Sequence, residues 1–355
     1  MNIRIINTTQ PKPRPADESK LAFGRVFTDH MLLIDYDTER GWYDPRVVPY
    51  GPLLLDPASS VLHYGQEVFE GLKCYRRPDG GFQLFRPRDN FERLHRSALR
   101  MGMAGVDEAL FLEGLLALLS VDKEWTPRAE GTSLYIRPTM IATDPFLGVS
   151  ASSRYLFYVI LSPCGAYYAD GLAPVGIYVE DELVRAVRGG VGFAKTGGNY
   201  AASILAGVHA KAKGYAQVLW LDGVEQRYVE EVGAMNMVFV YGGKRLITPA
   251  LNGSILPGIT RDSVLTLARG MGFDVVEQPI AIDEVMADAR SGEITEAFGT
   301  GTAAVVSPVN RICYQGKEVA LGNGLIGNVT MKLYHRLMDI QLGKTDDPMG
   351  WTMRI

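Results

Sequence analysis

The spacing of apolar and polar positions divides the chain into two differently organised halves. From Phe23 to about Ser162, short apolar runs of strand length are mixed with one clear amphipathic helix, predicted over residues 88–103. Its apolar positions recur at helical spacing: Phe91, Leu94, Ala98 and Met101. The apolar run SRYLFYVILSP, residues 153–163, predicts a buried strand that closes this half.

The second half alternates strands and helices more regularly. Helices are predicted over residues 198–214, 260–272, 283–292 and 328–343, and strands over residues 216–222 and 235–241. In the helix over residues 198–214, the apolar spacing predicts an inner face made of Ala201, Ile204, Leu205 and Val208. The last helix is expected to be capped by Asn328.

These elements predict an α/β protein of mixed α+β type with two domains. The first twenty residues are rich in proline and charge and are expected to form an arm instead of a packed element. Residues 164–176, CGAYYADGLAPVG, are rich in turn formers and lack apolar periodicity, which is typical of a linker. We therefore expect a small domain over residues 1–163 and a large domain over residues 177–355.

Composition narrows the functional classes. The 355 residues contain 36 Lys+Arg and 40 Asp+Glu, so the formal net charge of −4 favours no binding to nucleic acid. The three cysteines, at positions 74, 164 and 313, form no C-x-x-C pair, which favours a reducing compartment. The N-terminus lacks the apolar core of a signal peptide, and YLFYVIL is too short to cross a bilayer. A cytoplasmic protein without membrane contact is expected.

The segment GGVGFAKTGG, residues 189–198, places Lys195 in a glycine-rich stretch. It nearly matches the phosphate-loop pattern G-x-x-x-x-G-K-[ST], but Ala194 stands where that loop needs glycine. The preceding ELVRAVRGG resembles charged surface more than a buried strand. A nucleotide-hydrolysing or phosphate-binding protein stays open as an alternative.

Other functional sequence patterns are matched less well or are missing. GTGTAA, residues 299–304, matches a dinucleotide fingerprint, but the β-branched VVSPV after it predicts a tight turn that enters a strand. Amides of such a turn can bind a carboxylate or phosphate. The five histidines show no metal-ligand spacing, so no metal is expected, and no G-x-S-x-G of a serine hydrolase is present.

A lysine amine can also condense with a carbonyl group. An aldehyde cofactor with a phosphate and an aromatic nitrogen would need an arginine and helix N-termini for the phosphate, and a carboxylate for the ring nitrogen. The sequence contains each kind of partner.

AKTGGNYAAS, followed by EEVGAMN 36 residues after Lys195, resembles the fold-type IV pyridoxal-phosphate aminotransferases, specifically the branched-chain amino acid aminotransferases. Further blocks resemble that family in order across nearly the whole chain: FGRVFTDHML (23–32), LHYGQEVFEGLKCYR (62–76), DNFERLHRSA (89–98), LYIRPTMIATDPFLGV (134–149), GAYY (165–168), LNGSILPGITRDSVL (251–265) and FGTGTAAVVSPV (298–309). The resemblance implies a smaller N-terminal α/β domain and a larger C-terminal domain with pyridoxal 5'-phosphate between them.

The resemblance also implies roles for individual residues. Lys195 would hold the cofactor and then move a proton between substrate and cofactor. The other cofactor-binding residues would be Arg93, Tyr200, Glu231, Ile259, Thr260 and Thr302. Strand alternation sends neighbours to opposite faces, so either Glu230 or Glu231 points into the site, and the resemblance selects Glu231.

On the substrate side, the resemblance implies a pocket that accepts leucine, isoleucine or valine and also glutamate. Its residues would be Phe23, Tyr64, Phe69, Tyr135, Arg137, Val149, Tyr167, Ala234, Thr302 and Ala303, with Arg137 and Tyr64 meeting the γ-carboxylate. Val149 would reach the neighbouring subunit's pocket, so a homodimer is implied. Ala304 and Ser307 replace a redox C-x-x-C of some relatives. Relatives on the same fold, a D-amino acid aminotransferase or an aminodeoxychorismate lyase, remain alternatives.

Overall fold

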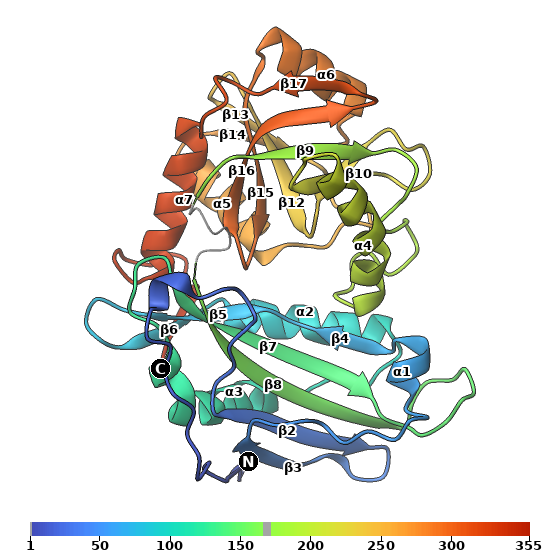
Figure 1. Ribbon diagram of the computed structural model, residues 1–355, viewed down its shortest axis with the longest axis vertical. Coiled ribbons are helices and arrows are strands. Elements are labelled where there is room, and N and C mark those ends of the chain that lie inside the picture. Colours follow the sequence, from blue (N-terminus) through green and yellow to red (C-terminus); the bar gives the residue numbers. More distant parts are fainter. Residues whose placement is uncertain (1, 166–171) are drawn as a thin grey trace. The chain divides into compact units, whose positions relative to one another are not determined.

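The chain forms two compact units, described by a computed structural model over residues 2–165 and 172–355 (Figure 1). The first unit comprises residues 1–169, 194–197 and 340–355, and the second comprises residues 170–193 and 198–339. The first unit therefore takes up two short segments from later in the sequence. Of the expected linker over residues 164–176, residues 166–171 lie outside the described residues.

The described part of the first unit contains a nine-stranded sheet. Its strands follow the order β1 (Arg4–Ile5), β3 (Gly41–Pro49), β2 (His30–Asp37), β8 (Arg154–Cys164), β7 (Ser133–Ala142), β5 (Leu72–Arg76), β6 (Phe82–Phe85) and β18 (Thr352–Arg354), with β4 (Glu67–Phe69) also paired to β7. All pairs are antiparallel except β1 with β3. Strands β5 and β4 pair with different stretches of β7, at residues 134–136 and 139–141. The strand predicted over residues 153–163 is confirmed as β8.

Helices cover one face of this sheet. They are α2 (Pro87–Arg100) and α3 (Glu108–Asp122), while α1 (Ser60–Tyr64) and the 3-10 turns η1 (Glu18–Lys20) and η2 (Lys123–Trp125) are short. The predicted amphipathic helix is confirmed as α2, which buries Phe91, Leu94 and Ala98 in the core. Strand β7 sends Leu134, Ile136 and Met140 into that core, so Tyr135 and Arg137 point to the opposite face.

The expectation of an unpacked N-terminal arm is wrong for several positions. Strand β1 pairs with β3, and the Thr8 N–H donates to His30 Nε2 at 3.0 Å. The Lys12 ammonium donates to the carbonyls of Phe27 and Thr28 at 3.2 and 2.7 Å. Hydrogen bonds to the backbone, instead of apolar burial, attach this segment, so hydrophobic periodicity gave no sign of it.

The second unit contains another nine-stranded sheet among its described residues. The order is β11 (Val229–Val232), β10 (Gln217–Leu221), β9 (Val175–Glu180), β16 (Val305–Tyr314), β15 (Ile294–Gly301), β12 (Met235–Tyr241), β13 (Arg245–Thr248) and β14 (Asp274–Glu277), with β17 (Lys317–Ala320) paired to β16. Because β11 also pairs with the start of β12, six strands close into a ring. The strands predicted over residues 216–222 and 235–241 are confirmed as β10 and β12, and the tight turn after residue 301 leads into β16 as expected.

The four predicted helices of the second half exist. They are α4 (Gly197–Ala212), α5 (Ile259–Gly270), α6 (Ile282–Ser291) and α7 (Asn328–Gln341). The predicted inner face of α4 is wrong: Ile204, Leu205 and Val208 are 66%, 54% and 57% exposed, and Ala201 is exposed as well. The helix instead buries Ala206 and Ala210, which pack with Val218 and Trp220 of β10. Alanine lets the helix approach the sheet closely, whereas an inference from hydrophobicity favours the larger side chains.

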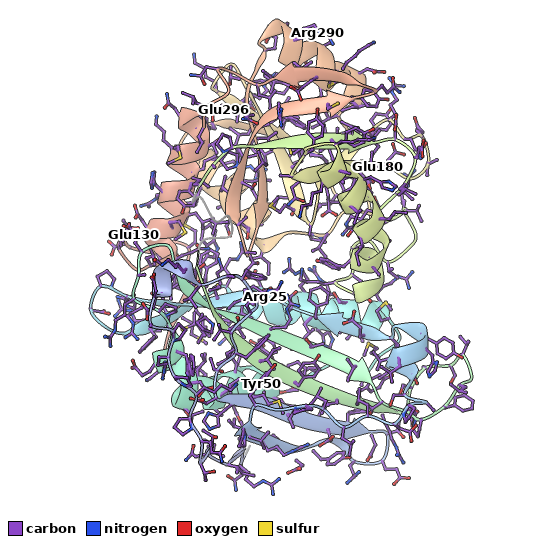
Figure 2. All side chains as sticks on the ribbon, in the orientation of Figure 1. Arg25, Tyr50, Glu130, Glu180, Arg290 and Glu296 are labelled. Carbon is purple, nitrogen blue, oxygen red and sulfur yellow. The ribbon has the colours of Figure 1, made fainter. Side chains whose placement is uncertain are left out.

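The cap of α7 also differs from the expectation. Asn328 is the first residue of the helix, and the carboxylate of Glu296, on β15, accepts the N–H groups of Val329 and Thr330 at 3.0 and 2.8 Å. Glu296 is labelled in Figure 2. A carboxylate at the N-terminus of a helix also interacts favourably with the helix dipole. Among the described residues, no helix combines the length and apolar character that a membrane span requires.

Candidate active site

The first unit holds the backbone of Lys195 on both sides. The Lys195 N–H donates to Ser97 Oγ, on α2, at 2.9 Å, and its carbonyl accepts from the Phe69 N–H, on β4, at 3.0 Å. Two residues further on, the Gly197 N–H donates to the carboxylate of Glu67, also on β4. Hydrogen bonds to two different elements therefore fix the peptide from which the amine extends.

Aromatic rings and cations gather around this lysine within the first unit. The Lys195 Nζ lies 4.9 Å from the ring centroid of Phe69, and the Arg137 Cζ lies 4.7 Å from the same centroid. Arg137 donates to the Tyr135 hydroxyl at 3.0 Å, and Phe23 meets the Tyr135 ring edge-on at 4.7 Å. The structure thus brings together five of the residues that the sequence assigned to substrate and cofactor. The apolar rings with one guanidinium suit a substrate that is partly aliphatic and partly charged.

Arg93 is almost fully buried on α2 and forms a two-pronged ion pair with Glu70. The Arg93 Nε and Nη2 lie 2.6 and 2.9 Å from the two carboxylate oxygens, and Glu70 is completely buried. Arg93 is therefore not a solvated residue on the surface of the helix. This pairing fixes the plane of the guanidinium, and the one-turn hydrogen bond from Ser97 Oγ to the Arg93 carbonyl connects it to the residue that holds Lys195.

In the second unit, the buried Glu231 on β11 is held by several donors. Its carboxylate lies 2.7 Å from Arg185 Nε and accepts from Asn236 Nδ2 at 3.2 Å and from the Leu256 N–H at 3.3 Å. Glu230 has a different set of partners, Asn252 and Ser254, as strand alternation requires. A nearby arginine favours the ionised form of Glu231, which is the form that can pair with a protonated ring nitrogen.

The N-terminus of α5 lies beside this carboxylate. Asn236 also donates to the Leu256 carbonyl at 2.9 Å, and a Cβ on Gly258 would collide with Asn236. Gly258 is the N-cap of α5, so Ile259 and the buried Thr260 form its first turn without a capping side chain. Backbone amides at such a helix start suit an anion.

A third element completes this group of second-unit residues. On β15, Thr300 pairs directly with Asn236, so their side chains share one face of the sheet. Thr302 and Ala303 follow in the three-residue turn before β16, and both are half-buried. The strand ladder therefore brings Glu231, the start of α5 and the turn at 302–304 to one region of the second unit.

Two buried hydroxyl groups test whether these residues suit a ligand such as pyridoxal phosphate. Within the described part of the chain, Thr196 Oγ1 beside Lys195 and Thr300 Oγ1 beside Asn236 are buried and have no hydrogen-bond partner. Buried hydroxyl groups normally have one, because leaving them unpaired costs about 1–3 kcal/mol. Thr196 belongs to the group around Lys195, and Thr300 belongs to the group around Glu231. A polar, phosphate-bearing ligand would suit hydroxyl groups that lack a hydrogen-bond partner.

The remaining predicted residues have other surroundings. The Tyr64 hydroxyl donates to the Leu147 carbonyl, Val149 is 86% exposed, and Ala234 is exposed in the turn between β11 and β12. Tyr200 is half-buried in the first turn of α4. Tyr167 lies outside the described residues.

Three residues that hold the site were missed from the sequence. Glu70 forms an ion pair with Arg93, and Ser97 accepts the N–H of Lys195. Arg185 forms an ion pair with Glu231. The segment that contains Arg185 was interpreted as charged surface, which is wrong at this position because Arg185 is buried and also bonds the carbonyls of Ser254 and Gly192. Glu70 stands inside the block FEGLKCYR, so that block was an available signal.

The phosphate-loop alternative does not fit the geometry around Lys195. A phosphate loop follows a strand and turns its amides toward the phosphates. Here β9 ends at Glu180, well before the lysine, and the Lys195 N–H is bound to Ser97.

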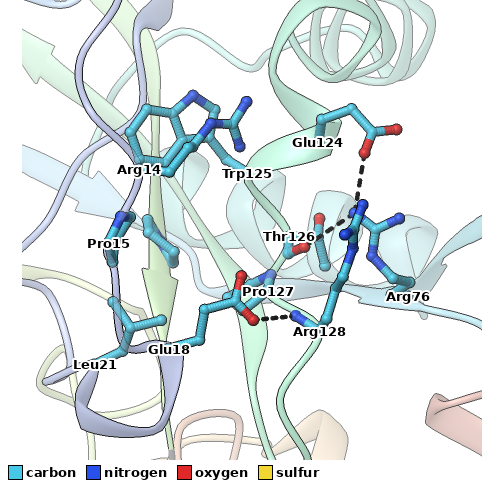
Figure 3. A pocket seen from close by; sticks show the side chains of 11 residues that line it. Arg14, Pro15, Glu18, Leu21, Arg76, Glu124, Trp125, Thr126, Pro127 and Arg128 are labelled. Carbon is cyan, nitrogen blue, oxygen red and sulfur yellow. Dashed lines mark hydrogen bonds and ion pairs between the residues drawn. The ribbon is translucent and has the colours of Figure 1, made fainter.

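A separate cavity of about 360 Å³ in the first unit, lined by Arg14, Glu18, Arg76, Trp125 and their neighbours, contains none of the predicted site residues (Figure 3).

Comparisons with known proteins show which family the chain resembles. Residues 67–312 match the family described as amino-transferase class IV. The chain is 56% identical over 349 residues to branched-chain-amino-acid transaminase 1 of Bacillus subtilis (strain 168), and the match covers 98% of each chain.

Solved structures are similar as well. The branched-chain aminotransferase of Thermoproteus uzoniensis with norvaline matches with a TM-score of 0.76 at 28% identity, over 92% of this chain and 99% of that one. The T.th. branched-chain amino acid aminotransferase complexed with N-(5'-phosphopyridoxyl)-L-glutamate matches with a TM-score of 0.74 at 27% identity, over 91% of this chain and 97% of that one.

The chain therefore belongs to the class IV aminotransferase family, and its mixed α/β fold is that of a fold-type IV enzyme. Within that family it is a branched-chain amino acid aminotransferase.

Proposed function

We propose that this aminotransferase exchanges amino groups between L-leucine, L-isoleucine or L-valine and 2-oxoglutarate by a ping-pong mechanism that uses pyridoxal 5'-phosphate. The products are branched-chain 2-oxo acids and L-glutamate. The observation that carries the proposal is the group of Lys195, Phe69, Tyr135 and Arg137, which places an amine, apolar rings and a guanidinium together. The phosphopyridoxyl-glutamate bound by the T.th. relative supports the choice of cofactor and of glutamate and 2-oxoglutarate as one substrate pair.

When bound, pyridoxal phosphate supplies an electron sink for the carbanion that forms at the substrate α-carbon. Lys195 would attach the cofactor and, once released, move the proton between the α-carbon and the cofactor's C4'. Glu231 would accept a hydrogen bond from the protonated ring nitrogen, and Tyr200 would donate one to the ring oxygen. The ion pair with Arg185 suits Glu231 to this role because it favours the carboxylate form.

The phosphate of the cofactor would be held by residues of three elements. We propose Arg93 on α2, the first-turn residues Ile259 and Thr260 of α5, and Thr302 in the turn after β15. Two observations support this assignment. Helix α5 begins at a glycine without a capping side chain, and the plane of the Arg93 guanidinium is fixed by Glu70.

The substrate would lie against apolar rings and one guanidinium. Phe23, Phe69 and Tyr135 would contact an aliphatic side chain, and Arg137 would bind the γ-carboxylate of glutamate or 2-oxoglutarate. The amides of Thr302 and Ala303 would receive the α-carboxylate. Tyr64, Val149, Tyr167 and Ala234 complete the proposed pocket by resemblance to the family.

The role of Lys195 is tested by reduction with borohydride. We expect the protein loaded with pyridoxal phosphate to be yellow, to bleach on reduction, and to carry the phosphopyridoxyl mass on the peptide containing Lys195. Lys195→Ala should lose turnover by about 10⁴-fold or more, because both the covalent link and the proton transfer are removed. Lys211→Ala, an exposed lysine of α4, serves as the control. Label on another peptide, or full activity of Lys195→Ala, would contradict the assignment.

The role of Arg137 is tested by a substrate comparison. Arg137→Met should raise the KM for 2-oxoglutarate about 10- to 100-fold, because a charge-assisted hydrogen bond to the γ-carboxylate is lost. The KM for leucine should change less than about threefold, since an aliphatic side chain makes no such bond. Equal losses for both substrates would show that Arg137 does not bind the side-chain carboxylate.

We propose that the enzyme acts as a homodimer in which Val149 reaches the pocket of the other subunit. The loop after β7 exposes Phe146, Leu147 and Val149 by 56%, 61% and 86%. Three neighbouring large apolar residues on one exposed loop are typical of an interaction surface. A second copy of the chain is the partner that the family resemblance implies.

A further inference from the structure

Glu67 lies beside the cationic group of the site and has no role in the function proposed above. It stands on β4 two residues before Phe69, so both side chains leave the same face of the sheet. The register pairs Glu67 with Ile141 and Phe69 with Thr139 of β7, and Arg137 occurs two residues before Thr139 on that face. The Glu67 carboxylate accepts the N–H of Gly197, two residues after the proposed catalytic lysine.

The charges around Glu67 are those of the substrate pocket. Two cations lie over the Phe69 ring, with Lys195 Nζ at 4.9 Å and Arg137 Cζ at 4.7 Å from its centroid. Glu67 interacts electrostatically with Arg137, and the Tyr158 phenol on β8 interacts electrostatically with both residues. The other carboxylate of this strand region, Glu70, is committed to Arg93. Glu67 is therefore the acid that faces Arg137.

The close approach of Glu67 is built into the backbone. A Cβ on Gly197 would collide with the Glu67 carboxylate, so glycine at this position lets the acid reach the amide. The hydrogen bond holds one carboxylate oxygen of Glu67 beside Gly197. A structural role for the acid alone would be met equally by a neutral amide, which can accept the same hydrogen bond.

We infer that Glu67 is a specificity-determining residue, whose negative charge opposes the binding of a side-chain carboxylate at Arg137 and so favours aliphatic substrates. This inference rests on the proposed function, in which Arg137 binds the γ-carboxylate of glutamate and 2-oxoglutarate. Arg137 alone would hold a dicarboxylate tightly, because a guanidinium and a carboxylate attract strongly away from bulk water. A second carboxylate nearby reduces that attraction and leaves the affinity for an aliphatic chain unchanged.

The same charge makes the discrimination depend on pH. Burial raises the pKa of Glu67, although the Gly197 N–H and Arg137 act in the opposite direction. Arg137 and Tyr158 both interact electrostatically with Glu67, and burial raises the pKa of Tyr158 as well, away from the acidic range. The neutral acid therefore prevails at low pH. As pH rises through the pKa of Glu67, affinity for a dicarboxylate should fall while affinity for an aliphatic monocarboxylate should not.

The experiment compares two ligands that do not react. Glutarate carries the side-chain carboxylate of 2-oxoglutarate, and 4-methylvalerate carries an aliphatic chain in its place. Calorimetric titration of the enzyme loaded with pyridoxal phosphate should show that Glu67→Gln binds glutarate about three- to tenfold more tightly, as expected for a partly screened charge a few ångströms away. Binding of 4-methylvalerate should change less than twofold. Glu39→Gln removes a charge from an exposed turn of the same unit and should leave both affinities unchanged.

Unchanged or weaker glutarate binding by Glu67→Gln would overturn the inference. If Glu67→Gln does not retain the cofactor, the wild-type enzyme decides: over the pH range in which both ligands are fully ionised, the ratio of glutarate to 4-methylvalerate affinity must fall with rising pH, and a constant ratio overturns the inference. Arg137→Met separates the two proposals. Loss of glutarate binding in Arg137→Met together with no effect of Glu67→Gln rejects the role of Glu67 alone, whereas unaltered glutarate binding in Arg137→Met rejects the proposed role of Arg137.

Discussion

The ion pair between Arg93 and Glu70 shows how one buried carboxylate orients a site residue from outside the site. Both carboxylate oxygens are used, and both side chains are almost completely excluded from water. Glu70 Oε2 also accepts the N–H of Gly71. Removing one charge of such a pair leaves the other buried without compensation, which costs more than the pair itself contributes.

We therefore expect Glu70→Gln to lower the free energy of unfolding by about 3 kcal/mol. Urea denaturation at a fixed cofactor concentration measures this loss. Glu108→Gln is the matched control, because Glu108 pairs with Arg88 on the surface, where such pairs contribute at most about 1 kcal/mol. A loss for Glu70→Gln no larger than that of the control would mean that the buried pair is not structurally important.

The same residues show what the sequence could reveal about the site. Lys195, Glu231 and Thr260 were assigned because each lies in a continuous block of residues with a recognisable order. The residues that hold them in place were not assigned. Ser97 is 98 positions from Lys195 and contacts it only after α2 and β4 have packed. Arg185 was missed because isolated charges in a sequence usually lie on the surface, and its burial depends on a strand partner far along the chain.

Whole elements were predicted better than their orientations. Strands β8, β10 and β12 and helices α2, α5 and α6 follow directly from continuous or periodic apolar runs. The orientation of α4 was wrong because its buried face is lined by Ala206 and Ala210, whose small size permits close packing on Trp220. Neither the closure of the second sheet through β11 nor the return of β18 to the first sheet has a local signal in the sequence.

The link between α5 and β14 provides a test at this scale. Arg261 and Arg269, both on α5, donate to the two carboxylate oxygens of Glu277 at 2.8 Å each. Partial burial raises the pKa of Glu277, but these arginines outweigh it, and the pKa lies below its usual value. The resulting stabilisation is complete above the pKa of an unfolded glutamate, about 4.3, and disappears as pH falls through the lower pKa of the folded state.

Glu277→Gln should therefore lower stability near neutral pH and flatten the loss of stability on acidification below about pH 4.5. Free energies of unfolding measured at several pH values between about 3 and 7 test this expectation. Glu284→Gln on the exposed side of α6 should leave the wild-type pH dependence intact. A wild-type pH dependence in Glu277→Gln would show that the two arginines do not stabilise α5 through this carboxylate.

For the whole molecule, the proposed dimer makes a prediction about mass and activity together. Light scattering after size exclusion should give twice the 39.0 kDa of one chain. Val149→Asp should shift the mass toward that of one chain and lower the affinity for leucine, because a buried charge at an interface is unfavourable. Leu325→Asp, at another exposed apolar position, should change neither quantity. A wild-type mass of one chain would contradict the proposed dimer.

The pairing of β18 with β6 has a consequence for the order of folding during synthesis. Strand β6 leaves the ribosome early, but its partner at residues 352–354 follows only after the entire second unit has been translated. A nascent chain thus exposes one edge of its first sheet for most of elongation, and an exposed strand edge invites pairing with other chains. The N–H of Ile355, which donates to the Phe82 carbonyl, extends this late pairing by one residue.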